Sequence, residues 1–234
     1  LHLCLTEGPA SAAPNLVADL INTQSFLHYT FGKWLLLSII PDNISYKRKI
    51  RKQISNEILA QIQVYKQLTG KQEIHLDGHQ HIHLVPIVLE EILKYAQSEN
   101  ITWIRSTREP LPSGLHFHYW MTALREAGCL KWILLQILSM IAIPRLRKHH
   151  VSTNGIFSGV FFTGQMSYYP LHACWRELAS RVVHQRDTAA IVLAHPGTPP
   201  AINLSQLGFA VSHDFALSER RTLEWRAMQD LQRS

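Results

Sequence analysis

Strands alternate with helices along most of this chain, and that rhythm limits the folds open to it. Runs of apolar and β-branched residues predict strands, and apolar residues repeating every three or four positions predict helices. In chain order these are a strand at 1–6, a helix at 46–69, a strand at 74–77, a helix at 86–97, strands at 101–104 and 156–162, a helix at 171–183, a strand at 190–194 and a last helix capped by Ser218. The order predicts an α/β fold with a largely parallel sheet, in which chemistry gathers at the carboxyl ends of strands.

The length and composition favour one globular domain over residues 1–234. A chain of 234 residues can bury a full core, and 46% hydrophobic with 17% charged residues excludes a disordered protein. Three scattered cysteines supply neither a disulfide framework nor a CxxC metal site, so a reducing cytoplasm is expected. The net charge of +6 comes without any nucleic-acid-binding motif, and no nucleic-acid partner is expected.

An apolar run from Leu130 to Ile143 stands apart from the rest of the sequence. Gln136 and Ser139 interrupt it and Pro144 follows it, so it falls short of the roughly 20 residues that a spanning helix needs. We expect it not to span a membrane. It is either a buried helix or an interfacial helix over 130–148 whose trailing basic residues face anionic lipid.

Histidines give the strongest chemical signal, since the chain has 14 of them. Three fall in the segment Asp77-Gly78-His79-Gln80-His81-Ile82-His83, just after a predicted strand. In an extended segment His79, His81 and His83 share one face, and neutral imidazole is a common ligand of divalent transition metals. Asp77 either adds an oxygen ligand or orients one ring. The alternative is a histidine-rich surface loop.

Two further histidines lie in predicted strands. His2 sits in Leu1-His2-Leu3-Cys4-Leu5-Thr6-Glu7-Gly8, where a core histidine with a backbone partner is the competing interpretation. His195 ends an apolar strand and precedes Pro196-Gly197. It has no ligand-like spacing, so a general acid is its more natural role.

The ordered motifs His-x-x-Leu-Thr-Glu-Gly, Asp-Gly-His-Gln-His-Ile-His, Ile-Arg with a downstream Glu-Pro, and His-Pro-Gly resemble the YdjC-like family. The resemblance implies a distorted TIM-like (β/α) barrel related to the NodB-type polysaccharide deacetylases, with a metal held by one aspartate and two histidines. His2 matches the first histidine ligand and His79 the second, with His81, His83 and Asp77 nearby. By the same resemblance His195 is the general acid, and Arg105 orients a catalytic carboxylate.

Family members also carry an Asp-Asp-Phe-Gly-type motif, which supplies the carboxylate ligand and the catalytic base. The resemblance places that motif and the first barrel strand before Leu1, and makes residues 115–150 an insertion that contains the apolar helix.

The implied activity is hydrolysis of the N-acetyl group of an amino sugar, with magnesium or zinc as the divalent ion. The implied substrate is an oligosaccharide or a lipid-linked sugar. The alternative is a catalytically impaired barrel that binds metal or glycan. We further expect a cytoplasmic protein, with peripheral contact at the inner membrane surface through 130–148 and a homodimer as open alternatives.

Overall fold

The computed structural model describes residues 1–182, 189–197 and 218–233, which form two compact units. The first unit contains residues 1–105 and 141–153, and the second contains 106–140 with the described residues from 154 onward. That residues 1–234 fold as one domain, with an insertion at 115–150, stays a prediction.

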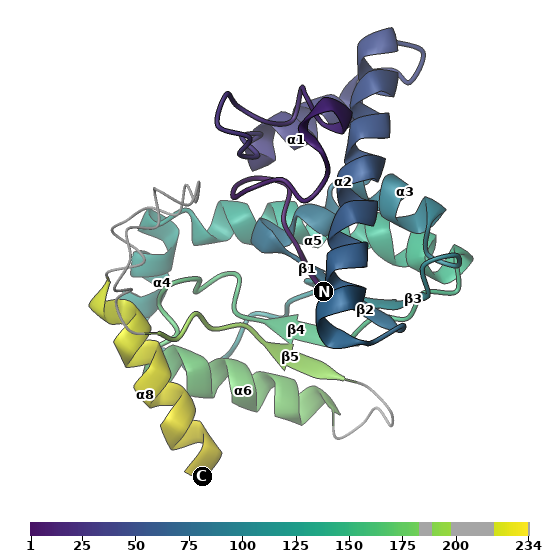
Figure 1. Ribbon diagram of the computed structural model, residues 1–234. Coiled ribbons are helices and arrows are strands. Elements are labelled where there is room, and N and C mark those ends of the chain that lie inside the picture. Colours follow the sequence, from purple (N-terminus) through teal and green to yellow (C-terminus); the bar gives the residue numbers. More distant parts are fainter. Residues whose placement is uncertain (183–188, 198–217, 234) are drawn as a thin grey trace. The chain divides into compact units, whose positions relative to one another are not determined.

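The first unit is built on a parallel sheet of three strands (Figure 1). Its strands lie in the order β1 (His2–Leu3), β2 (Ile74–Gly78) and β3 (Ile101–Ile104), and His2 is paired in register with Asp77. The helices of this unit are η1 (Pro14–Leu16), α1 (Phe31–Ile39), α2 (Ser45–Thr69), η2 (His79–Leu84) and α3 (Pro86–Lys94). The parallel pairing confirms the β-turn-α-β rhythm predicted for this half.

Helix α2 follows the predicted amphipathic pattern. The isoleucines of its inner face are completely buried: Ile50, Ile54, Ile58 and Ile62. Gly70 ends the helix in the left-handed conformation with φ 69°, as a C-terminal glycine should. Pro86 stands in the first turn of α3, where its missing N–H costs nothing.

The second unit contains a parallel pair of strands, β4 (Ile156–Ser158) and β5 (Ala190–Val192). Helix α6 (Tyr168–Val182) packs along this pair, and α8 (Glu219–Arg233) packs on α6 (Figure 1). Two more helices precede the pair in sequence, α4 (Phe117–Arg125) and α5 (Gly128–Lys148). Helix α5 contains the whole apolar run and continues through Pro144 into the first unit.

Four elements are shorter than predicted. Strand β1 covers only His2–Leu3 of the predicted 1–6. Strand β4 ends at Ser158 rather than 162, because Gly159 adopts φ 120° and its Cα lies too close to the backbone of Leu193 for any side chain. Helix α3 ends at Lys94 rather than 97. The predicted strand at 190–194 stops at Val192 and is half-buried.

The parallel α/β architecture is therefore confirmed. Within the described ranges, the strands form one sheet of three and one sheet of two. A closed TIM-like barrel stays a prediction.

Candidate active site

The candidate site lies around the short strand β1 and the carboxyl end of β2 in the first unit. Because His2 and Asp77 are register neighbours, His2 Nδ1 lies 3.2 Å from Asp77 Oδ2. The His2 and His79 rings approach edge to face, with centroids 5.8 Å apart. The structure thus brings together two histidines separated by 77 residues, as the resemblance required.

The histidine-rich segment itself is not extended, and this part of the prediction was wrong. It turns immediately into η2, where Gln80 and His81 have φ of 51° and 60°. The three rings consequently point to different partners instead of sharing one face. His79 approaches Glu7, His81 Nδ1 lies 2.9 Å from Arg105 Nη2, and the buried His83 contacts the Arg105 carbonyl oxygen through Nε2 at 2.8 Å.

Asp77 is the hub of the site. Its Oδ1 accepts from the Gly78 amide at 2.6 Å and forms an ion pair with Arg105 Nη2 at 2.7 Å, while its Oδ2 faces His2. Burial alone raises the pKa of Asp77, but the His2 hydrogen bond and the positive charge of Arg105 outweigh burial and bring the pKa down to about 2. Asp77 is therefore a carboxylate at neutral pH, and Arg105 orients it.

His83 is the most enclosed member of the segment. Complete burial lowers its pKa to about 4, so the ring is neutral at physiological pH. Its Nε2 meets the Arg105 carbonyl, and its Nδ1 lies 3.9 Å from Asp77 Oδ1. This position makes His83 a support of the site, between Asp77 and the backbone of Arg105.

Gly78 leaves room for that ring, and this contact gives a prediction. A Cβ at Gly78 would lie 2.5 Å from His83 Nδ1 and 3.0 Å from the His83 amide nitrogen. We expect Gly78→Ala to lower the free energy of unfolding by about 2 kcal/mol, since overpacking in a filled interior typically costs 1–3 kcal/mol. Urea unfolding followed by tryptophan fluorescence measures this.

Gly32→Ala is the matched control, because a Cβ there meets nothing within 4 Å and the position is helical. Alanine should leave stability unchanged or raise it by up to about 1 kcal/mol. Equal stability of the Gly78→Ala protein and the wild type would contradict the packing described for His83.

Glu7 is a buried carboxylate to which the sequence analysis gave no role. Its Oε1 lies 2.6 Å from His79 Nε2 without hydrogen-bond geometry, and its Oε2 is buried without a hydrogen-bond partner. A buried carboxylate oxygen without a hydrogen-bond donor or a cation beside it lowers the stability of the fold. The signal in the sequence was its place in the Thr6-Glu7-Gly8 turn that follows β1.

The donors at this site suit a divalent cation. Imidazole nitrogens and a carboxylate oxygen are ligands of zinc, and carboxylate oxygen also suits magnesium. Two rings converge, and a carboxylate with an uncompleted oxygen lies beside one of them. Within the described part of the chain, however, no set of three or more His, Cys, Asp or Glu side chains has the arrangement of a complete metal site. The residues present fit two histidine ligands of such a site.

His195 lies in the second unit, where α8 holds the turn that carries it. The Glu224 carboxylate accepts from the His195 amide at 2.5 Å and from the Met166 amide at 3.1 Å. One turn earlier on the helix, Arg221 donates to the carbonyl oxygens of His195 and Pro196. Glu224 and Arg221 therefore fix the backbone of His195 from both sides, a support that the sequence motif alone did not reveal.

Glu109, also in the second unit, is a second buried carboxylate with several donors. Its two oxygens accept from the Ser158 hydroxyl and from the amides of Gly159, Val160 and Phe161. Burial raises the pKa of Glu109 to about 7, although these donors oppose the shift. Glu109 closes the turn after β4, which gives the Glu-Pro motif a structural role.

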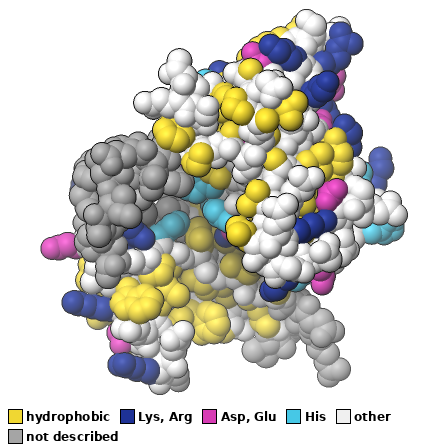
Figure 2. All heavy atoms as spheres, in the orientation of Figure 1, with side chains coloured by type: hydrophobic (Ala, Val, Ile, Leu, Met, Phe, Trp, Pro, Cys, Tyr) yellow, Lys and Arg dark blue, Asp and Glu magenta, His cyan; other side chains and the backbone are white. Residues whose placement is uncertain are grey.

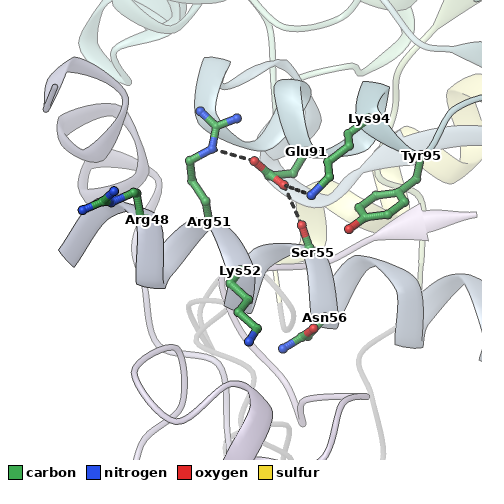
Figure 3. Close-up of a pocket in the computed structure, with 8 residues that line it drawn as sticks. All are labelled: Arg48, Arg51, Lys52, Ser55, Asn56, Glu91, Lys94 and Tyr95. Carbon is green, nitrogen blue, oxygen red and sulfur yellow. Dashed lines mark hydrogen bonds and ion pairs between the residues drawn. The ribbon is translucent and has the colours of Figure 1, made fainter. Parts of the chain in front are cut away.

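A separate hollow of about 640 Å³ lies between α2 and α3 (Figure 3). Figure 2 shows Lys and Arg side chains gathered over the end of the molecule where α2 begins. Within the hollow, Glu91 lies 2.6 Å from Arg51 Nε, 2.5 Å from the Ser55 hydroxyl and 3.9 Å from Lys94 Nζ. The Glu91 carboxylate is paired with Arg51 and Ser55, so these contacts join α3 to α2. Glu91 therefore has a structural role in the hollow.

Comparison with known proteins places these motifs in context. The chain is 29% identical over 210 residues to a carbohydrate deacetylase of Xenopus laevis and 26% identical over 202 residues to one of Homo sapiens. Each match covers 85% of this chain but only 64% and 58% of those relatives, so the chain spans about six tenths of their length. The model of the YdjC-like protein family matches residues 1–233. The chain therefore belongs to the YdjC-like family.

Proposed function

We propose that this chain contributes to a metal-dependent hydrolase that removes the acetyl group from an N-acetylated amino sugar. The observation that carries the proposal is the convergence of His2 and His79 beside Asp77, around strand β1 and the carboxyl end of the parallel strand β2. Parallel α/β enzymes commonly place their sites at such strand ends. Relatives named carbohydrate deacetylase support the substrate class.

The same reasoning favours the distorted TIM-like barrel as the complete fold. Strands β1, β2 and β3 are parallel and adjacent, and helices connect them, as in one sector of a (β/α) barrel. The family to which the chain belongs supports this architecture for the complete domain.

His2 and His79 are the proposed histidine ligands, with magnesium or zinc as the ion. Asp77 occupies the Nδ1 side of His2, which leaves Nε2 as the nitrogen for a cation and fixes the ring in the manner typical of metal-binding histidines. A bound divalent ion lowers the pKa of water and polarises an amide carbonyl. The carboxylate ligand and the base are assigned to the family's Asp-Asp motif, with Glu7 beside His79 as the nearest acidic group in this chain.

The chain's own residues have three further tasks in this proposal. Arg105 holds Asp77 charged and in place, and Asp77 in turn holds His2. His195, fixed through its backbone by Glu224 and Arg221, donates a proton to the departing sugar nitrogen. This proton is needed because an amide anion is a very poor leaving group. The alternative of an impaired binding barrel has less support, since the relatives are named for catalysis.

The test uses the chain extended at its N-terminus by the family's preceding segment. This protein is incubated with N-acetylglucosamine oligomers and, separately, with lipid-linked N-acetylated sugars, and acetate is measured. We expect acetate release that EDTA abolishes and that added divalent metal restores. Absence of acetate from both substrate classes would contradict the proposed activity, and release unaffected by EDTA would contradict its metal dependence.

A further inference from the structure

Helix α5 carries apolar residues on two opposite faces. The inner face is buried and consists of Leu135, Leu138, Ala142 and Leu146. The outer face repeats every three or four residues and is exposed to solvent, with Leu130 at 68%, Ile133 at 44%, Ile137 at 49% and Met140 at 69%. An ordinary surface helix has polar residues on its outer face, so this stripe is unusual and calls for a partner.

The charges on α5 are all of one sign. No Asp or Glu occurs between Ala127 and Arg176, while Lys131, Arg147 and Lys148 are exposed on the helix. Pro144 continues the exposed stripe, and Arg147 and Lys148 follow it within one turn. The outer face therefore combines exposed apolar side chains with a cationic carboxyl-terminal end, which is the composition of a helix that lies in the interface of an anionic membrane.

A spanning helix is a poorer description of α5. By length and composition, α5 is the one helix among the described residues that is apolar enough to cross a membrane. Its inner face is nevertheless buried in the protein, and the exposed stripe from Leu130 to Pro144 is about 21 Å long, against roughly 30 Å of bilayer hydrocarbon. The whole helix is long enough for a crossing, but it has only one face to offer to lipid.

A second copy of the chain is also a poorer partner. Parallel pairing of two stripes places Arg147 and Lys148 beside the same residues of the other copy, and antiparallel pairing places them beside the apolar residues at the start of its stripe. With no acidic side chain on α5, the first arrangement sets like charges against each other, and the second gives them no counter-charge on that helix. A negatively charged membrane surface, by contrast, attracts Arg147 and Lys148.

We propose that the outer face of α5 binds the surface of an anionic lipid bilayer, with Leu130, Ile133, Ile137 and Met140 at the level of the acyl chains and Arg147 and Lys148 among the lipid phosphates. This inference does not depend on the proposed deacetylase activity, since the stripe and its charges exist without any substrate. It would bring the chain to the surface where lipid-linked sugars reside.

The test is co-sedimentation of the protein with vesicles of phosphatidylcholine alone or mixed with phosphatidylglycerol. We expect binding to the mixed vesicles that weakens as salt is raised. The double variant Leu130→Glu/Met140→Glu, and separately Arg147→Glu/Lys148→Glu, should each lower partitioning about tenfold or more. The charge variant alters only exposed side chains, so it remains informative should the stripe variant fold poorly.

Two control variants make the same kinds of substitution at exposed residues outside α5. Leu68→Glu/Leu223→Glu alters two other exposed leucines, and Arg48→Glu/Lys52→Glu reverses charge at the hollow between α2 and α3 (Figure 3). Both controls should bind vesicles like the wild type. The proposal is overturned if the wild type does not bind anionic vesicles, or if it binds neutral vesicles equally well. It is also overturned if the control variants lose as much vesicle binding as the test variants. A stripe variant whose only effect is to convert a dimer to a monomer in analytical ultracentrifugation would overturn it as well.

Discussion

Replacing Asp77 with asparagine is expected to lower the free energy of unfolding by about 3 kcal/mol at pH 7, the low end for breaking a buried ion pair from one side. Arg105 is 7% exposed and would lose its counter-ion, while Gly78 and His2 would lose an anionic acceptor. The loss of the His2 partner should also weaken metal binding by about 10- to 100-fold.

The pH dependence of this effect follows from the sign of the shift. The pKa of Asp77 is about 2 in the folded protein, against an ordinary value of 3.8 for an aspartate in the unfolded chain. The ionised carboxylate therefore stabilises the fold above pH 4. That contribution is lost as the pH falls through the interval from 4 to 2. The difference between wild type and Asp77→Asn, measured by denaturant unfolding at several pH values, should therefore narrow below pH 4.

Asp42→Asn serves as the control for Asp77. The Asp42 side chain also meets two cations, Lys47 and Arg51, but it is 69% exposed, so its removal should change stability little. A loss at Asp77 no greater than the loss at Asp42, or one that is constant from pH 7 to pH 3, would contradict the role assigned to Asp77.

Replacing His195 with glutamine is expected to lower kcat for acetate release by about 100- to 10,000-fold, the range typical of a lost general acid. Glutamine retains size and polarity but cannot deliver a proton to the sugar nitrogen. Metal affinity should remain at the wild-type value, because His195 is assigned no ligand role. The measurement combines steady-state kinetics of the extended chain with metal titration of the same variant.

His172→Gln is the matched control for His195. His172 is a histidine of the same unit that lies against Tyr168 on α6. Its replacement should leave kcat within about a factor of three. A kcat for His195→Gln as high as that of the control would remove His195 from the reaction.

Elements whose local sequence matches their burial could be predicted from the sequence. Helix α2 follows from its buried isoleucines and Gly70, and β2 and β3 follow from short apolar runs separated by a helix. The family motifs also indicated that His2 and His79 lie in one site. The pairing of β1 with β2 brings the two rings close to each other. The helix and the two strands depend on patterns that repeat regularly along the chain, whereas the meeting of the two histidines was indicated by the family motifs alone.

Features that depend on long-range contacts could not be predicted. The turn of Gln80 and His81 into positive φ replaced the expected extended segment, and only the contacts of His81 and His83 with Arg105 explain it. Strand β4 stops early because Glu109, about 50 residues away, takes the amides that would otherwise continue it. Helix α1 was not predicted. Its buried residue Trp34 donates a hydrogen bond to the carbonyl oxygen of Leu5, and the sequence pattern does not reveal this distant contact.

The central claim is that His2 and His79 hold one divalent ion, and isothermal titration of the extended chain with zinc tests it most directly. We expect one ion per chain, with His2→Ala and His79→Ala each lowering the affinity about 100-fold or more. The control is His75→Ala, which replaces an exposed histidine of β2 that faces Glu73, and this variant should bind zinc like the wild type. Wild-type affinity in both the His2 and His79 variants would contradict the account.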